Sequence, residues 1–193
     1  MGRLKRTLVR LLRCRHSRGF GIQSPWAYAL VCNVINEHLP YYAYQEKALC
    51  DAMEGWPREK QRLAWLYFRL ANMRRPLTIH DNKGAASPYA PFYKAGCNRS
   101  KVADAQEIQT AERVEFVRLD AQPDNKEALQ TVVQKADGNS ILVLEGINES
   151  RDSREMWREL VADERCINTF DLYDCGIIFF DRKRYKEDYI INF

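Results

Sequence analysis

The polar residues best placed for chemistry each follow a short apolar segment in the second half of the chain. Carboxylate and amide oxygens can accept hydrogen bonds from the hydroxyl and amine groups of a ligand. A glycine among them would let the backbone approach that ligand closely. Residues of this kind follow such segments at Asp81, Asn82, Gly84, Gln106 and Asp120, which could contact a ligand or lie in ordinary polar loops.

Several neighbouring side chains allow two interpretations each. His80 titrates near neutrality and could act as a general base, or it could simply pack on a strand. Glu145 could face a substrate or serve only to cap a turn. An aromatic cluster near residue 42 could form a lid over a substrate or a plug between helices and sheet; it consists of Tyr41, Tyr42 and Tyr44.

Hydrophobic periodicity divides the chain near Pro76. Before it, apolar residues at helical spacing predict helices at 2–14, from Pro25 to the residue before Pro40, at 44–53 and at 58–74. After it, short apolar segments alternate with helical ones. We predict strands at 77–80, 101–105, 114–119 and 141–145, and helices at 86–95, 125–136 and 151–162. Two further strands at 169–173 and 177–181 would form a hairpin around 174–176, before a last apolar segment at 189–193.

This alternation of strands and helices predicts the fold class. It implies right-handed crossovers and a parallel sheet that is covered by helices on both faces. We expect an α/β, Rossmann-like fold with a mostly parallel sheet that ends in a C-terminal antiparallel hairpin. Residues 1–75 should form a helical extension packed on an α/β domain of residues 76–193.

Composition excludes several classes of protein. With 46% hydrophobic and 29% charged residues in 193, the chain should fold as a soluble globular protein. No apolar run reaches the roughly 18 residues of a membrane span, and the basic N-terminus lacks the features of a secretory signal, so we expect a cytoplasmic protein. The six cysteines form no C-x-x-C pair and the three histidines are scattered, so we predict no metal site. Motifs of serine hydrolases, P-loop NTPases and zinc proteases are also missing from the sequence.

The positive charge is concentrated at the N-terminus. Residues 1–18 contain seven basic residues and no acid, whereas the whole chain carries +4, which leaves −3 on the remainder. Leu4, Leu8, Leu11 and Leu12 would share one face of the predicted helix. The helix could bind nucleic-acid phosphates or an anionic membrane surface. Alternatively, it could pack its leucines on the domain and leave its arginines in solvent.

Longer segments of the sequence resemble a known family. The segments are "GFGIQSPWAY", "VINEHLPYYAY", "ILVLEGINESRDSREMWRELVADER" and "TFDLYDCGIIFFDRKRYKEDYIINF". They are similar to bacterial methyltransferase-like proteins with the fold of class I S-adenosylmethionine (SAM)-dependent methyltransferases. The resemblance implies SAM as a cofactor. It also implies a cofactor turn at Asp81, Asn82 and Gly84, a ribose contact at Gln106 and an adenine contact at Asp120.

The chain departs from this family at the segment that should bind the cofactor. The first turn, "LTIHDNKGAAS", has one glycine, Gln106 is not an acid, and Pro88 and Pro91 interrupt the next helix. One strand is expected to be missing between Asp120 and Ile141, where the family has a strand that supplies catalytic groups. We therefore expect a methyltransferase-like protein with an eroded cofactor site. It would be non-catalytic and would serve as a binding or scaffold protein for a small molecule or a protein partner. The alternatives are an active SAM-dependent methyltransferase of unknown small-molecule substrate, or a binder of nucleic acid or membrane surfaces through residues 1–18.

Overall fold

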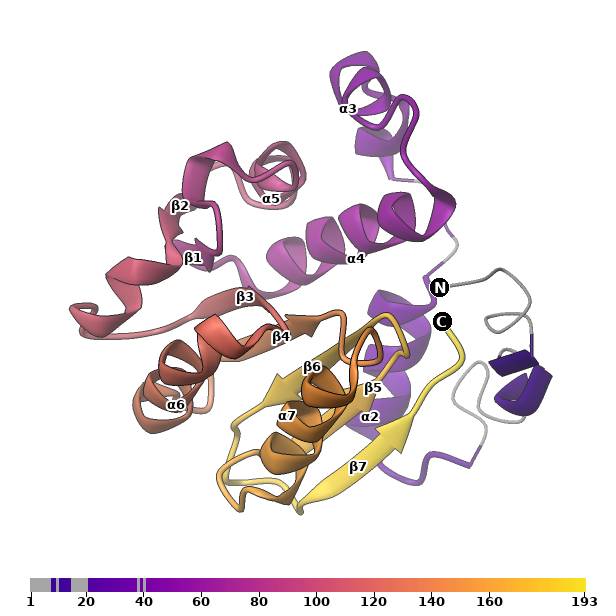
Figure 1. Ribbon diagram of the computed structural model, residues 1–193. Coiled ribbons are helices and arrows are strands. Elements are labelled where there is room, and N and C mark those ends of the chain that lie inside the picture. The colour runs from indigo at the N-terminus through magenta and orange to yellow at the C-terminus, as the bar shows by residue number, and fades with distance from the viewer. Residues whose placement is uncertain (1–7, 10, 15–20, 38, 40) are drawn as a thin grey trace.

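A seven-stranded mixed sheet forms the centre of the computed structural model, which describes residues 8, 9, 11–14, 21–37, 39 and 41–193. The strand order is β2-β1-β3-β4-β6-β5-β7, and only β6 runs antiparallel to its neighbours (Figure 1). The strands are β1 (Thr78–Asp81), β2 (Lys101–Asp104), β3 (Phe116–Asp120), β4 (Ile141–Glu145), β5 (Asn168–Asp171), β6 (Cys175–Phe179) and β7 (Glu187–Ile190).

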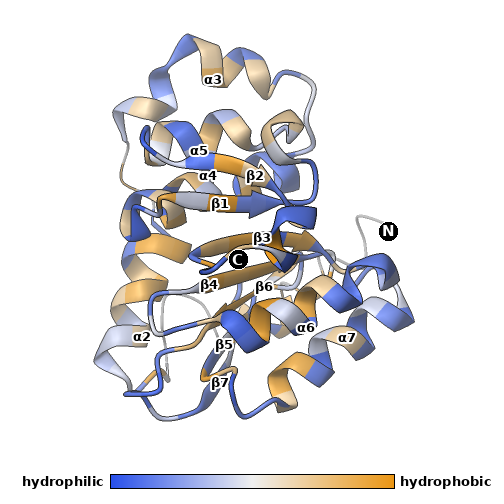
Figure 2. Ribbon diagram, turned by 90° about the vertical axis from the view of Figure 1, so that its left-hand side faces the viewer, coloured by the Kyte–Doolittle hydropathy of each residue, from blue (hydrophilic) through white to orange (hydrophobic). Residues whose placement is uncertain are grey.

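Helices cover both faces of this sheet, because successive side chains of each strand point to opposite sides. In β4, Val143 belongs to a core with α2 (Pro25–Leu30), α4 (Arg58–Arg74) and α5 (Ala90–Gly96). Its neighbours Leu142 and Leu144 belong to a second core with α6 (Lys126–Lys135) and α7 (Arg151–Ala162). Figure 2 shows the two groups of helices on either side of the strands. The predicted Rossmann-like α/β class, with its C-terminal hairpin, is confirmed.

Capping residues explain where several helices begin and end. Ser24 caps α2, with Pro25 in the first turn, and the Ser150 hydroxyl accepts from the Ser153 N–H at the start of α7. The helix α4 spans 58–74 as predicted, and a left-handed Arg75 ends it just before Pro76. A short α3 (Lys47–Ala52) precedes it.

Several predicted boundaries were wrong. The helix from Pro25 is not uniform, because α2 gives way to a π-helical turn, Val31–Ile35. The helix predicted at 86–95 is divided into a 3-10 turn, Gly84–Ala86, and α5. Pro91 lies in the first turn of α5, where its missing N–H costs no hydrogen bond, so the helix starts there.

The hairpin turn and the end of the first strand also differ from the prediction. Gly176 lies inside β6 rather than in the turn, and the Trp157 ring packs so closely against it that a Cβ there would lie 2.3 Å from that ring. The turn therefore falls at 172–174. At the first strand, Asp81 is the last residue of β1 and not part of the following loop.

The missing strand was assigned to the wrong place. In the doubly wound order 3-2-1-4-5, the third strand lies outside the second. Here β3 instead pairs with β1 on the side away from β2, and then with β4. The position outside β2 is therefore the vacant one, and β3 takes the place next to β1 that a fourth strand usually holds. Asp120, the last residue of β3, thus lies at the carboxyl end of a strand in the interior of the sheet, between β1 and β4.

The described part of the N-terminal segment is helical at residues 8, 9, 11 and 12, and the rest of the helix predicted at 2–14 lies outside the described residues. Leu8, Leu11 and Leu12 are exposed to 58%, 65% and 72%. The interpretation in which these leucines pack on the domain is therefore wrong. Within the described chain, no helix is both long enough and apolar enough to cross a bilayer.

Candidate functional site

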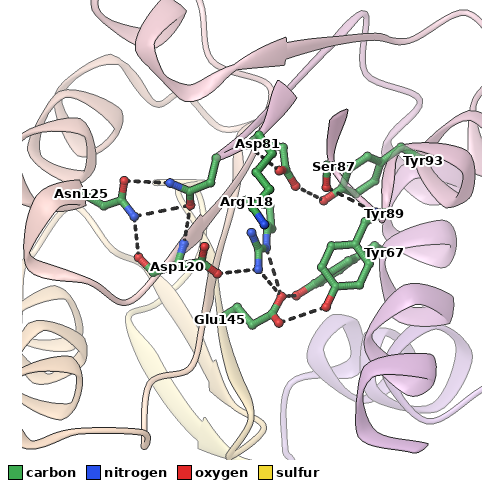
Figure 3. Close-up of polar contacts among 11 residues, drawn as sticks. Tyr67, Asp81, Ser87, Tyr89, Tyr93, Arg118, Asp120, Asn125 and Glu145 are labelled. Atoms are coloured by element: carbon green, nitrogen blue, oxygen red, sulfur yellow. Dashed lines mark hydrogen bonds and ion pairs between the residues drawn. The ribbon is translucent and has the colours of Figure 1, made fainter. Parts of the chain in front are cut away.

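Three parallel strands bring charged side chains together at their carboxyl ends. Because β1, β3 and β4 pair in register, Asp81 lies beside Arg118, and Asp120 lies beside Glu145. Strand alternation points these side chains to the face that α4 and α5 cover. Figure 3 shows them meeting tyrosines from that side. We call this group the polar cluster; it consists of Tyr67, Asp81, Tyr89, Tyr93, Arg118, Asp120 and Glu145.

Arg118 is the centre of the polar cluster and is 5% exposed. Its Nη2 lies 2.6 Å from Oδ1 of Asp120 and 2.6 Å from Oε2 of Glu145, and its Nε donates to the same Glu145 oxygen at 3.0 Å. A buried guanidinium needs such partners, because an unpaired charge in the interior is strongly unfavourable. Burial opposes the charge on Arg118, but the adjacent carboxylates of Glu145 and Asp120 prevail and raise its pKa.

Three tyrosine hydroxyls supply hydrogen bonds to the acids. Tyr67 and Tyr89 donate to the two oxygens of Glu145 at 2.7 and 3.0 Å, and Tyr93 donates to Oδ2 of Asp81 at 2.8 Å. Burial, and then the adjacent carboxylate, raises the pKa of each phenol. The hydroxyls therefore stay protonated and act as donors.

Asp120 is the acid of the cluster that faces solvent most, with a side chain 39% exposed. Burial raises its pKa, Arg118 opposes this effect, and the charge of Glu145 adds to it. Asp120 therefore takes up a proton more readily than an ordinary aspartate.

A cleft of about 580 Å³ opens above this part of the sheet. Its volume is in the range of small-molecule sites. Acidic and basic groups alternate around it, and two aromatic rings contribute apolar surface. Its lining is Pro57, Glu59, Lys60, Leu63, Lys83, Pro88, Tyr89, Arg118, Asp120, Glu145, Gly146, Asn148, Glu149, Tyr173 and Asp174.

Of the five predicted ligand-binding residues, Asp120 lines the cleft. Asp81 is fully buried and accepts hydrogen bonds from Tyr93 and from the Lys83 N–H. Gln106 is exposed in a 3-10 turn beyond β2, because β2 ends at Asp104. Its position at the strand end was therefore predicted wrongly, and the residue at the strand end is an acid, Asp104.

Asn82 and Gly84 make contacts within the protein. The Asn82 Oδ1 accepts from the Asp120 N–H at 2.6 Å, and its Nδ2 donates to Oδ1 of Asn125 at 2.9 Å. Gly84 adopts a positive φ of 50° against the backbone of Asp104, where a Cβ would lie 3.1 Å from the Asp104 nitrogen. Only a glycine fits this approach without strain. Asn82 thus links β1 to β3, and Gly84 holds the loop against the end of β2.

His80 and the three tyrosines near residue 42, for which the sequence allowed two interpretations each, lie outside the cleft lining. His80 is 2% exposed and its Nδ1 has no hydrogen-bond partner. Tyr41 and Tyr44 pack on aromatic residues of α4, whereas Tyr42 is 96% exposed, and the cleft lining includes none of the three. Among the residues that the structure describes, no group of three or more His, Cys, Asp or Glu is arranged to hold a metal ion.

Sequence reasoning missed Arg118 and the role of the tyrosines. A charged residue in an otherwise apolar strand, "FVRLD", was a usable signal. Its inward position demands carboxylates on adjacent strands, and β1 and β4 both end in an acid. By contrast, Tyr67 and Tyr89 have no such signal, because their contact with Glu145 depends on how α4 and α5 pack.

The strand order, the single antiparallel strand β6 and the flanking helices define a Rossmann-like fold of the methyltransferase type. A crystal structure of the SAH-bound Podospora anserina methyltransferase PaMTH1 is similar, with a TM-score of 0.53 and 14% sequence identity over 75% of this chain and 98% of that one. No family model and no curated protein sequence matches the chain. The similarity therefore establishes the fold.

Proposed function

We propose that this chain is a methyltransferase-fold protein that binds a small molecule in the cleft beside Asp120 and does not transfer methyl groups from SAM. One observation carries the proposal. In doubly wound sheets, ligands bind in the crevice where the strand order reverses, which here lies between β1 and β3. The 2.6 Å hydrogen bond from the Asp120 N–H to Asn82 spans that crevice, and Asn125 braces it.

The contact of Gly84 supports the same proposal. A cofactor cradle uses glycine so that a ligand can approach the backbone. In this chain the space beside Gly84 is taken by the Asp104 backbone, 3.1 Å from an added Cβ. The residues present therefore fit a nucleoside cofactor poorly at the ends of β1 and β2.

Glu145, the more buried of the two cluster acids that line the cleft, is not free to act as a base. Methyl transfer requires an aligned nucleophile and in some cases a general base. Both oxygens of Glu145 accept from tyrosines, and Arg118 binds one of them. Tyr89 stays protonated because burial and Glu145 raise its pKa. These groups are arranged to bind one another rather than to accept a proton from a substrate.

Calorimetric titration of the purified chain with SAM and with SAH, at ligand concentrations up to about 1 mM, tests this proposal. We expect no saturable heat. The variant Asn82→Ala removes the bridge across the crevice, and saturable binding that appears only in this variant would identify Asn82 as the barrier. Saturable binding to the unaltered chain, weakened by Asp120→Ala, would overturn the proposal.

An active methyltransferase is the second candidate. The open cleft beside Asp120 favours it, as does a structural neighbour solved with SAH. In that case the unaltered chain would bind SAM and release SAH slowly. The methyl group of SAM would pass to water, giving methanol, or to an added small molecule. Chromatography of SAM after incubation with the protein distinguishes the two candidates, because our proposal predicts no SAH above the level of a protein-free sample.

A further inference from the structure

The N-terminal helical segment points its apolar side chains away from the protein. Leu8, Leu11 and Leu12 fall at i, i+3 and i+4, which places them on one face of a helix. All three are more than half exposed. Exposed apolar residues grouped on one helix face are unusual on a monomeric surface and mark a binding site for another apolar surface.

The opposite face of this segment is fixed to the sheet by a charged contact. The Arg13 guanidinium donates to both carboxylate oxygens of Asp171, at 2.9 and 3.1 Å, and lies 5.4 Å from the centre of the Tyr173 ring. Its side chain is 16% exposed. Val9, one turn earlier, lines the same contact region. This contact fixes the orientation of the segment, which is the short indigo helix beside the C-terminal end in Figure 1.

The sequence on both sides of the leucines is strongly basic. Residues 1–18 contain seven basic residues and no acid. On α7, Arg154 and Arg158 are exposed and line a groove together with Leu12. The same groove also contains Arg13, Lys186 and three acids, Asp171, Glu164 and Asp188, and Arg13 is paired with Asp171. An apolar face with a basic surround is the pattern of a helix that lies in the interface of an anionic membrane.

We propose that the helical segment containing Leu8, Leu11 and Leu12 docks this protein on an anionic lipid surface. The leucines enter the boundary between headgroups and acyl chains, and the basic residues bind the lipid phosphates. A nucleic acid would satisfy the charges but offers no apolar surface to three leucines. A second copy of the chain would bring an equally basic segment to the same place, and the like charges repel. This inference is independent of what the cleft binds.

Co-sedimentation with vesicles tests the proposal on the full chain. We expect saturable binding to phosphatidylcholine vesicles that contain about 30% phosphatidylglycerol, and little binding to pure phosphatidylcholine. Replacing all three leucines by alanine should weaken the partition coefficient about tenfold or more. A matched control is available in the body of the protein. Leu77→Ala alters a leucine that is 61% exposed before β1, so it should bind like the unaltered chain, whereas Leu11→Ala should not.

Four results would overturn the proposal. The first is absence of binding to the anionic vesicles by a chain that is folded by circular dichroism. The second is binding that the triple alanine variant leaves unchanged, since the leucines would then have no part in it. The third is preferential binding to a duplex oligonucleotide that also ignores the leucines. The fourth is a dimer in sedimentation velocity that the triple variant converts to a monomer.

Discussion

Replacing Glu145 by glutamine should destabilise the protein more than replacing Asp120 by asparagine. Glutamine keeps the shape of the side chain and an oxygen for one tyrosine. It removes the charge that holds Arg118, which donates to Glu145 at 2.6 and 3.0 Å while only 5% exposed. Hydrogen bonds to charged groups contribute about 1.5–3 kcal/mol, and neutral ones about half of that.

The expected loss follows from these contacts. Two charge-assisted bonds weaken, but Asp120 still pairs with Arg118, so the cost should lie near the lower end of the range for breaking a buried pair, about 3 kcal/mol. For a chain of this length, that corresponds to a fall in Tm of about 6–12 °C. Asp120→Asn should cost less than about 1 kcal/mol, because the Asp120 side chain is 39% exposed and makes one contact with Arg118.

A double-mutant cycle measured by urea unfolding isolates the interaction. In an Arg118→Met background, Glu145→Gln should cost little, because the buried positive charge is gone. Glu159→Gln, in an exposed pair with Lys126, serves as the control and should change the free energy of unfolding by less than about 1 kcal/mol. The reasoning is refuted if Glu145→Gln costs as little as this control, or costs the same with and without Arg118.

Two further variants test contacts elsewhere in the fold. Gly84→Ala should lower the free energy of unfolding by about 2–3 kcal/mol, because an added Cβ would press on the Asp104 backbone. The control, Gly55→Ala, has a similar positive φ but nothing within 4 Å of the added Cβ, and it should cost about 1 kcal/mol. Equal losses would mean that the close approach of Gly84 to Asp104 is unimportant. Burial lowers the pKa of His80, so the folded state resists its protonation and stability should fall as the pH drops below about 6.5. His80→Leu should make the urea midpoint less dependent on pH in that range, and an unchanged pH dependence would contradict this assignment.

The sequence predicted the elements well where local patterns decide them. The helices α4 and α7 and the strand β4 have the predicted bounds, because each has a clear period and a strong start or stop signal. The errors occurred where tertiary contacts override the local pattern. The glycine at 176 suggested a turn, but it lies in β6 against Trp157 of α7, and no local pattern in the sequence reveals that contact.

The candidate site was predicted less completely than the fold. Asp120 was identified because it follows an apolar strand, and it does line the cleft. Asn82 and Asp81 were identified by the same rule, but their partners, Asn125 and Tyr93, come from other elements. Spacing along the chain cannot show whether a polar side chain at a sheet edge faces a ligand or another part of the protein.

The position of Arg118 has a consequence for how the chain folds. Strand alternation places Arg118 over the polar cluster and its neighbour Leu119 in the second core. A slip of β3 by one residue would exchange these faces and bury a guanidinium among leucines and valines without a carboxylate. The acceptors that Arg118 needs belong to Asp120 and to Glu145 of the next strand, and Tyr67 of α4 donates to the same Glu145 oxygen, so these contacts form only when β3, β4 and α4 are in their native places. Arg118 therefore disfavours any other register of β3 relative to its neighbours.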